Sequence, residues 1–250
     1  MTVDRKHGAG RRRFIRTCVS AAAAVSASPG LLAQQGATMK PYDPVTLADA
    51  NGRPLRVDQL AAGECYVFFY PYVTTPCFLM NLGKPTDSDV TLRTERGNSY
   101  RWQGGVGPER SIVAFSAICA HKMTYPSESV SFINYRHNAV RFVNSKKEQS
   151  ERSQVIYCCS ERSVYDPAKG AQVLGGPAPQ PLAAIHLEYD TDAGSLQALG
   201  TYGGELFDQF INAFEFRLAL DFRITNISQR VTGATTVIPS AEYSEIQILC

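Results

Sequence analysis

Much of the chain consists of short hydrophobic stretches in which apolar and polar residues alternate, or in which β-branched and aromatic residues cluster. Such stretches follow one another from residue 66 to residue 158: Tyr66–Tyr70, Phe78–Leu82, Val90–Leu92, Ser111–Phe115, Val130–Tyr135, Val140–Val143 and Val155–Cys158. Groups of Pro, Gly, Asn and Ser separate each stretch from the next. Many short strands divided by turn residues are typical of a sandwich or barrel, so the pattern predicts an all-β domain.

The pattern changes near the end of the chain. Apolar residues recur there at helical spacing, after two glycines: Leu206, Phe207, Phe210, Ile211 and Phe214. The next apolar residues alternate as they would in a strand: Phe216, Leu218, Leu220 and Phe222. We therefore expect one short C-terminal helix, a closing strand, and a tail over residues 226–250. Core packing accounts for these aromatic residues, which are no evidence for a cofactor site.

Charge divides the chain into two unequal parts. Residues 1–33 contain six Lys or Arg and one Asp, a balance of +5, whereas the whole chain has a formal charge of +2. The remainder therefore carries 2 − 5 = −3. A mildly acidic body gives no reason to expect nucleic acid as a partner.

The basic N-terminus has the layout of an export signal. Arg11–Arg16 precede an uncharged, weakly apolar run from Thr17 to Ala33. The segment Arg-Arg-Arg-Phe-Ile-Arg resembles the twin-arginine consensus, which implies export of a protein that is already folded, often with its metal cofactor inserted. We expect a signal peptide over residues 1–33 and a periplasmic protein. The alternative is a retained, weak membrane anchor, because the run is at the short end of what spans a bilayer.

Residues with metal-binding chemistry lie in two separate segments. Cys119-Ala120-His121 follows a hydrophobic stretch, and Cys158-Cys159-Ser160-Glu161-Arg162-Ser163-Val164-Tyr165-Asp166 comes later, followed by Gly175-Gly176-Pro177-Ala178-Pro179. A thiolate and an imidazole two residues apart in an extended loop can reach the same small cluster. Thiolate suits iron held with sulfide, and a neutral imidazole tunes the reduction potential.

In this order the motifs resemble the Rieske [2Fe–2S] family. Its signature is Cys-x-His in one loop and Cys-x-x-His in a second, followed by Ser, Tyr, Asp and a Gly-Pro-Ala-Pro loop. The resemblance implies stacked antiparallel β-sheets over residues 34–225, with a cluster-binding subdomain at about residues 116–182. It also implies that Cys119 and His121 bind a [2Fe–2S] cluster and that Ser163 and Tyr165 donate hydrogen bonds to it.

The second loop departs from the family pattern because it contains no histidine. In one register Cys158 is the thiolate ligand and Glu161 occupies the histidine position. In the other register Cys159 is the ligand and Arg162 stands where histidine should be. The fourth ligand is therefore the other cysteine, Glu161, Arg162 or water, and the sequence leaves these alternatives open.

Other residues add little to this ligand set. The remaining histidines are His7 in the expected signal, His137 between the two loops and His186 in a strand-like run. Thr124 and Ser160 occupy the positions of the loop-to-loop disulfide that many members of the family have. Cys250, at the end of the expected tail, has no expected role.

The resemblance implies a one-electron carrier or an electron-transfer subunit rather than a catalyst by itself. Its partner would be a cytochrome, the large subunit of a molybdenum oxidase, or a quinol-oxidising complex. The missing ligand motivates the alternative of a cluster-free Rieske-like scaffold that serves as a binding or structural subunit. A ferredoxin of a ring-hydroxylating oxygenase would work in the cytoplasm, which the export signal argues against.

Overall fold

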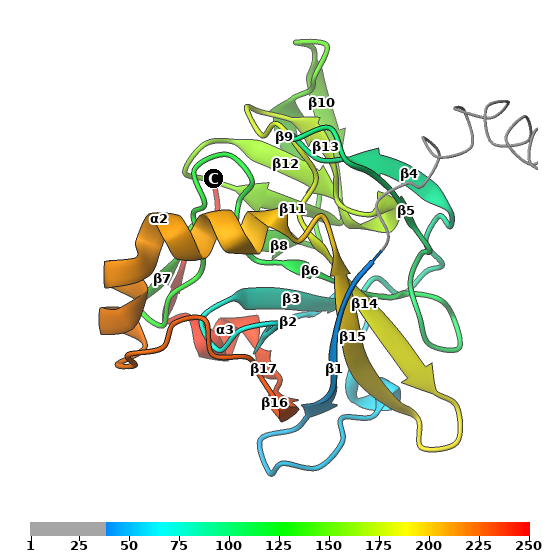
Figure 1. Ribbon diagram of the computed structural model, residues 1–250. Helices are drawn as coiled ribbons and strands as arrows, with labels where there is room; N and C mark the ends of the chain where they lie inside the picture. Colours follow the sequence, from blue (N-terminus) through cyan, green and yellow to red (C-terminus); the bar gives the residue numbers. More distant parts are fainter. Residues whose placement is uncertain (1–38) are drawn as a thin grey trace, which may run out of the picture. The chain divides into compact units, whose positions relative to one another are not determined.

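The computed structural model describes residues 39–250 (Figure 1). The expected signal peptide, residues 1–33, lies outside the described residues. Strands are the main regular structure of the described residues, and the prediction of an all-β fold is confirmed. None of the helices in this part of the chain is both long and apolar enough to span a bilayer.

The largest sheet has eight strands, in the order β16-β1-β15-β14-β6-β3-β2-β17. In that order the strands are Gly233–Thr236, Lys40–Ala48, Ser195–Tyr202, Ala184–Asp190, Ile112–Ser116, Pro76–Asn81, Cys65–Phe69 and Ile238–Pro239. Neighbouring strands of this sheet are antiparallel, except β1 and β16, which are parallel. The predicted stretches at residues 66–70, 78–82 and 111–115 correspond to β2, β3 and β6.

A four-stranded sheet in the order β13-β12-β11-β8 carries the second motif segment (Figure 1). Its strands are Gln172–Gly175, Ser163–Asp166, Val155–Cys158 and Ile133–Arg136. Three two-stranded sheets complete the strand content: β4 (Val90–Arg93) with β5 (Ser99–Trp102), β9 (Val140–Val143) with β10 (Gln149–Arg152), and β7 (Val130–Ser131) with β18 (Ile246–Gln247). Two short 3₁₀ helices, Val57–Gln59 and Pro167–Lys169, lie in connections.

The eight-stranded sheet is covered on both faces, and strand β6 shows this directly. All five of its residues are buried. Ile112 and Ala114 pack in a core that includes the helix α2 (Glu205–Asp221), whereas Val113 and Phe115 pack in a second core with residues of the four-stranded sheet. Because successive side chains of a strand point to opposite faces, the sheet connects the two layers.

Residues 216–221 belong to a helix, and the prediction of a closing strand was wrong. Helix α2 extends to Asp221, with a kink at Phe214, and is longer than the short helix expected. Leu218 is buried, while Phe216 and Leu220 are 78% and 61% exposed. The apolar alternation therefore does not reflect burial. Leu218 lies four residues after Phe214 and faces the core because of the helical repeat.

The last residues belong to the fold, so the expectation of a tail over residues 226–250 was also wrong. Strand β16 pairs with β1, β17 pairs with β2, and β18 pairs with β7. A short helix α3 (Ser240–Tyr243) lies between β17 and β18. These strands have two to four residues, too few to produce a periodic pattern, and they form because earlier strands offer unpaired edges.

Candidate metal centre

Two turns bring the motif segments together. The first follows β6, where the Cys119 N–H donates to the Thr124 carbonyl and the Met123 N–H donates to the Cys119 carbonyl, at 2.8 and 2.9 Å. The second joins β11 to β12, with Cys158 paired to Ser163 across the hairpin. Both turns are therefore held by backbone hydrogen bonds, which fix the direction of the side chains they carry.

The two thiols of Cys119 and Cys158 lie side by side in the second core, and both residues are fully buried. The Tyr165 hydroxyl is 3.3 Å from the Cys119 Sγ and accepts a hydrogen bond from the Ala120 N–H at 3.1 Å. Since that oxygen already accepts a hydrogen bond, its own proton is free to be donated to sulfur. Tyr165 therefore lies within hydrogen-bond distance of one of the two thiols.

Hydrogen-bond donors surround both sulfur atoms. The Cys158 thiol lowers the pKa of Cys119 by hydrogen bonding, and the Tyr165 hydroxyl and the His121 N–H add to this effect against the cost of burial. The same contact and burial raise the pKa of Cys158, although the N–H groups of Ser160 and Glu161 oppose this. The site therefore stabilises negative charge on the Cys119 sulfur, with Cys158 as the protonated partner.

A second pair of ligand-type groups lies beside the thiols. The His121 Nδ1 and the Glu161 Oε2 are 3.6 Å apart, and the Lys122 Nζ is 3.4 Å from the other oxygen of Glu161. The His121 Nδ1 and the Ser163 Oγ are buried and have no hydrogen-bond partner. Because buried polar atoms in folded proteins are normally satisfied, the unpartnered nitrogen suggests a missing ligand.

The geometry separates the two registers of the second loop. Both Glu161 and Arg162 line a surface cavity with Gly176 and Pro177, but the carboxylate of Glu161 faces His121, while Arg162 has a positive φ of 59°. Cys158 is the cysteine beside Cys119. The register with Cys158 and Glu161 therefore agrees with the structure, and the register with Cys159 and Arg162 does not.

Cys159 was expected as an alternative ligand, but the structure pairs it with Cys250 in a disulfide across 91 residues of sequence. Cys158 faces the core at the end of β11, and the next residue points the opposite way, towards the end of the chain. Nothing in the sequence indicated this bond, because Cys250 lies in a segment without a clear pattern.

The other histidines of the described chain lie elsewhere. His137 packs near Tyr135 and Gly63. His186 belongs to β14 and contacts Tyr202. Neither takes the place of the missing histidine ligand.

Within residues 39–250, no group of three or more His, Cys, Asp or Glu side chains is arranged to hold a single metal ion. A [2Fe–2S] cluster needs a different arrangement, since its protein ligands are divided between two irons, with two of them on each iron in Rieske centres. Cys119 with Cys158, and His121 with Glu161, provide two such pairs. The donors present therefore fit a two-iron cluster.

Gly176 closes the loop that follows the site, and we expect Gly176→Ala to destabilise the protein. Its φ is +82°, and an added Cβ would lie 2.2 Å from the Arg162 carbonyl oxygen. Gly233→Ala is the control, because Gly233 has a φ of +71° with nothing within 4 Å. The control should cost about 1–2 kcal/mol from backbone strain alone. Gly176→Ala should cost about 1–3 kcal/mol more from the clash, measured by denaturant unfolding. Equal losses would show that the Gly176 loop can move.

No protein-family model matches the chain. Among solved structures, the chain is similar to the soluble domain of the Rieske protein II (soxF) from Sulfolobus acidocaldarius. The two share 24% sequence identity, the match covers 64% of this chain and 78% of that chain, and the TM-score is 0.41.

Proposed function

We propose that the protein is a one-electron carrier that holds a Rieske-type [2Fe–2S] cluster between its two turns. Cys119 and Cys158 would bind one iron, and His121 and Glu161 would bind the other. The observation that carries the proposal is the buried, unpartnered Nδ1 of His121, which faces Glu161 beside two buried thiols. When bound, the cluster would accept and release one electron.

The residues around the ligands would tune this site. Tyr165 and the N–H groups of His121, Ser160 and Glu161 donate towards the cysteine sulfur atoms. Such hydrogen bonds stabilise added electron density and raise the reduction potential. A carboxylate in place of a neutral imidazole has the opposite effect, because it adds negative charge to the site. We therefore expect a potential below the range of about −150 to +300 mV of centres with two histidines.

The proposal includes an exported, periplasmic location and a redox partner. The basic segment Arg11–Arg16 and the run that follows it support export. A cytochrome, the large subunit of a molybdenum oxidase or a quinol-oxidising complex is the kind of partner that such a carrier would serve. Electron transfer in a larger oxidoreductase fits this site better than independent catalysis.

Iron content tests the proposal directly. The full chain would be produced in cells that assemble iron–sulfur clusters and purified without oxygen. We expect equal amounts of iron and acid-labile sulfide, visible absorbance, and an EPR signal after reduction. A colourless protein without iron would instead support the cluster-free scaffold, for which the absence of a second-loop histidine is the specific observation.

Restoring the family ligand should change the potential in a predictable direction. We expect Glu161→His to raise the reduction potential by on the order of 100 mV, because it replaces an anionic ligand with a neutral one. An EPR-monitored redox titration would measure the shift. The control is Arg162→His, which should leave the potential much less changed because Glu161, and not Arg162, faces His121. A shift in Arg162→His and none in Glu161→His would favour the rejected register.

A further inference from the structure

The eight-stranded sheet opens between two of its central strands. Strand β14 pairs with β15 along its whole length but with β6 only at Ala184 and Phe115. Beyond that point a pocket of about 310 Å³ lies between the strands, lined by residues of β6, of β14 and of the connection from β5 to β6. The β14–β15 register also shifts between His186 and Leu187, next to the pocket. Such irregularities occur often beside binding sites.

A glycine-rich connection forms the outer wall of this pocket. The Val106 N–H and C=O both bond to Ile112, which folds the connection back onto β6. The Gly105 N–H donates to the Thr86 hydroxyl at 2.7 Å. A Cβ on Gly105 would lie 2.5 Å from the Arg110 carbonyl oxygen. The wall is therefore fixed in place, and the pocket exists without a ligand to form it.

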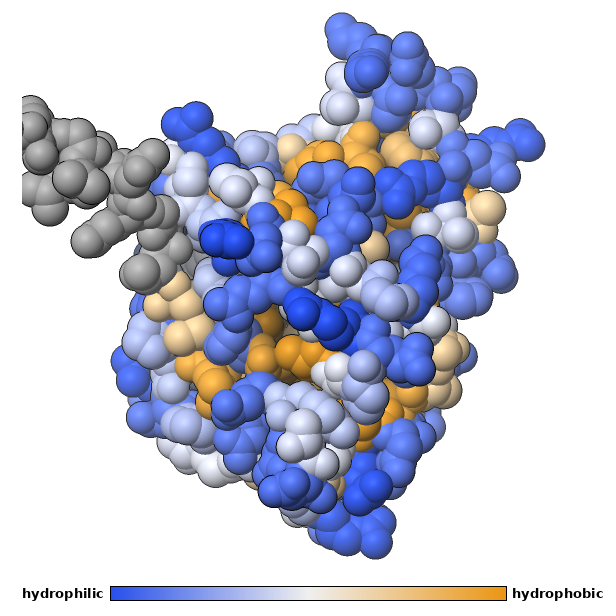
Figure 2. Space-filling model, turned by 90° about the vertical axis from the view of Figure 1, so that its right-hand side faces the viewer, coloured by the Kyte–Doolittle hydropathy of each residue, from blue (hydrophilic) through white to orange (hydrophobic). Residues whose placement is uncertain are grey.

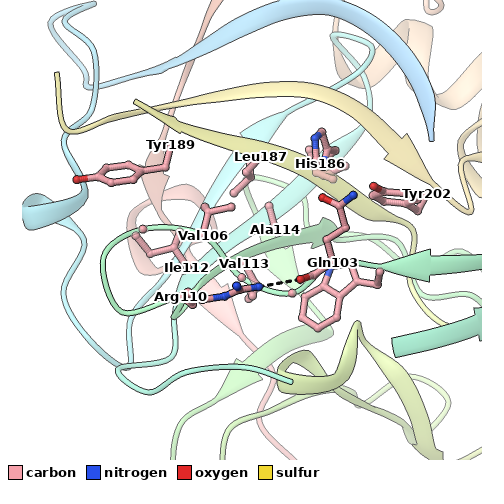
Figure 3. Close-up of a pocket in the computed structure, with 15 residues that line it drawn as sticks. Gln103, Val106, Arg110, Ile112, Val113, Ala114, His186, Leu187, Tyr189 and Tyr202 are labelled. Carbon is pink, nitrogen blue, oxygen red and sulfur yellow. Dashed lines mark hydrogen bonds between the residues drawn. The ribbon is translucent and has the colours of Figure 1, made fainter. Parts of the chain in front are cut away.

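The pocket is apolar inside and polar at its rim. Figure 2 views the molecule from the side on which β14, β15 and the β5–β6 connection lie, and it shows hydrophobic residues at the bottom of a hollow among hydrophilic ones. Val106, Ile112, Ala114 and Leu187 make the apolar part. In Figure 3 the side-chain amide of Gln103 points towards His186 and Tyr202, away from these residues.

One cation lines the pocket, and no acidic residue does. The Arg110 Nη2 donates to the Gln103 carbonyl at 3.0 Å, which holds the guanidinium along the wall (Figure 3). Among the described residues no carboxylate forms an ion pair with Arg110. Its remaining N–H groups are therefore available to an anion.

The neutral polar groups complement this cation. Burial lowers the pKa of His186, although Glu188 opposes the shift, so its imidazole is neutral at pH 7 and can donate or accept a hydrogen bond. The Gln103 amide can also do both. A ligand with one carboxylate and an apolar body would satisfy the cation, these two groups and the apolar wall together.

We propose that the pocket between β6 and β14 binds a small organic monocarboxylate, with its carboxylate on Arg110 and its apolar body against Val106, Ile112 and Leu187. The size, the largely preformed wall and the few polar groups agree with ordinary small-molecule sites. This inference does not depend on the iron–sulfur cluster, because none of the four proposed ligands lines this pocket.

Titration of the full chain, isotopically labelled for NMR, with 3-phenylpropionate and with its amide tests the proposal. The two probes share their shape and differ in charge. We expect a dissociation constant in about the millimolar range for the carboxylate, as for a weak fragment of this size, and at least about tenfold weaker binding of the amide. Acetate has the carboxylate but lacks the apolar body, so it should bind more weakly than 3-phenylpropionate. Shifts should centre on the amides of Gly104, Gly105 and Leu187.

Two variants and a control complete the experiment. Arg110→Gln should weaken carboxylate binding about tenfold and leave the amide unaffected, whereas Arg110→Lys should retain most of the affinity. Arg101→Gln is the control, since Arg101 pairs with Asp89 and lies outside the pocket. The inference would be overturned if both probes bound equally, if Arg110→Gln left carboxylate binding unchanged, or if the chemical-shift changes mapped outside the pocket. It would also be overturned if the carboxylate showed no binding at 20 mM, roughly twenty times the expected dissociation constant. Iron content, measured on the same samples, decides the proposed function separately.

Discussion

Cys119→Ser is expected to remove nearly all iron from the protein, together with its visible absorbance and its EPR signal. Cys119 is fully buried, and a hydroxyl cannot replace a thiolate as a soft ligand to iron held with sulfide. The substitution also removes the atom towards which Tyr165 and the His121 N–H donate. Iron and sulfide analysis after anaerobic purification would measure the loss.

A matched control separates ligand loss from a general effect of removing a buried thiol. Cys65 is a free, buried cysteine in β2, away from the two turns, and burial raises the pKa of its thiol. Cys65→Ser should therefore keep its iron. Circular dichroism of both variants would show that each is folded. Iron retained in a folded Cys119→Ser variant would contradict the proposed ligand set.

Cys250→Ser is expected to lower the free energy of unfolding by up to about 4–5 kcal/mol. The reason is that the Cys159–Cys250 bond closes a loop of 91 residues, and a longer closed loop restricts the unfolded chain more. For a protein of this size the loss corresponds to a fall in melting temperature of roughly 10 °C. Calorimetry of the oxidised protein and the variant would measure it.

The disulfide also provides a test of the ligand register. Cys159→Ser should lose as much stability as Cys250→Ser but keep its iron, because Cys158 is the proposed ligand. Alkylation of the denatured, unreduced protein should leave Cys159 and Cys250 unlabelled and label the free cysteines Cys65, Cys77, Cys119 and Cys158. If Cys159→Ser lost its iron while Cys250→Ser kept it, Cys159 would be a ligand of the cluster. Labelling of Cys250 would show that the disulfide bond is absent.

The last residue of the chain contacts the second turn of the candidate site. The Cys250 N–H is 3.0 Å from the Cys159 Sγ, and the Arg136 guanidinium donates to the Cys250 carbonyl. The second turn is thereby held from both sides, by the β11–β12 hairpin and by the last residue. The Cys159–Cys250 bond is thus a covalent link between the second turn and the end of the chain.

The sequence alone determined the features that depend on neighbouring residues. Short runs of β-branched and aromatic residues between turn residues predicted β2, β3 and β6, because such runs are typical of buried strands. The two motif segments predicted, through their resemblance to the Rieske family, that Cys119, His121, Ser163 and Tyr165 would share one site. Within each strand or motif the informative residues lie a few positions apart, whereas joining the two segments depended on the resemblance.

Tertiary structure decided whatever depends on contacts between distant segments. The helix continues through Leu218 because a buried core lies on that side, and Cys159 points to Cys250 rather than to Cys119. Glu161 faces His121 only because the hairpin turn directs it there. The pocket beside Arg110 exists because two strands diverge. No local pattern records these outcomes, since each results from pairing and packing between residues far apart in the chain.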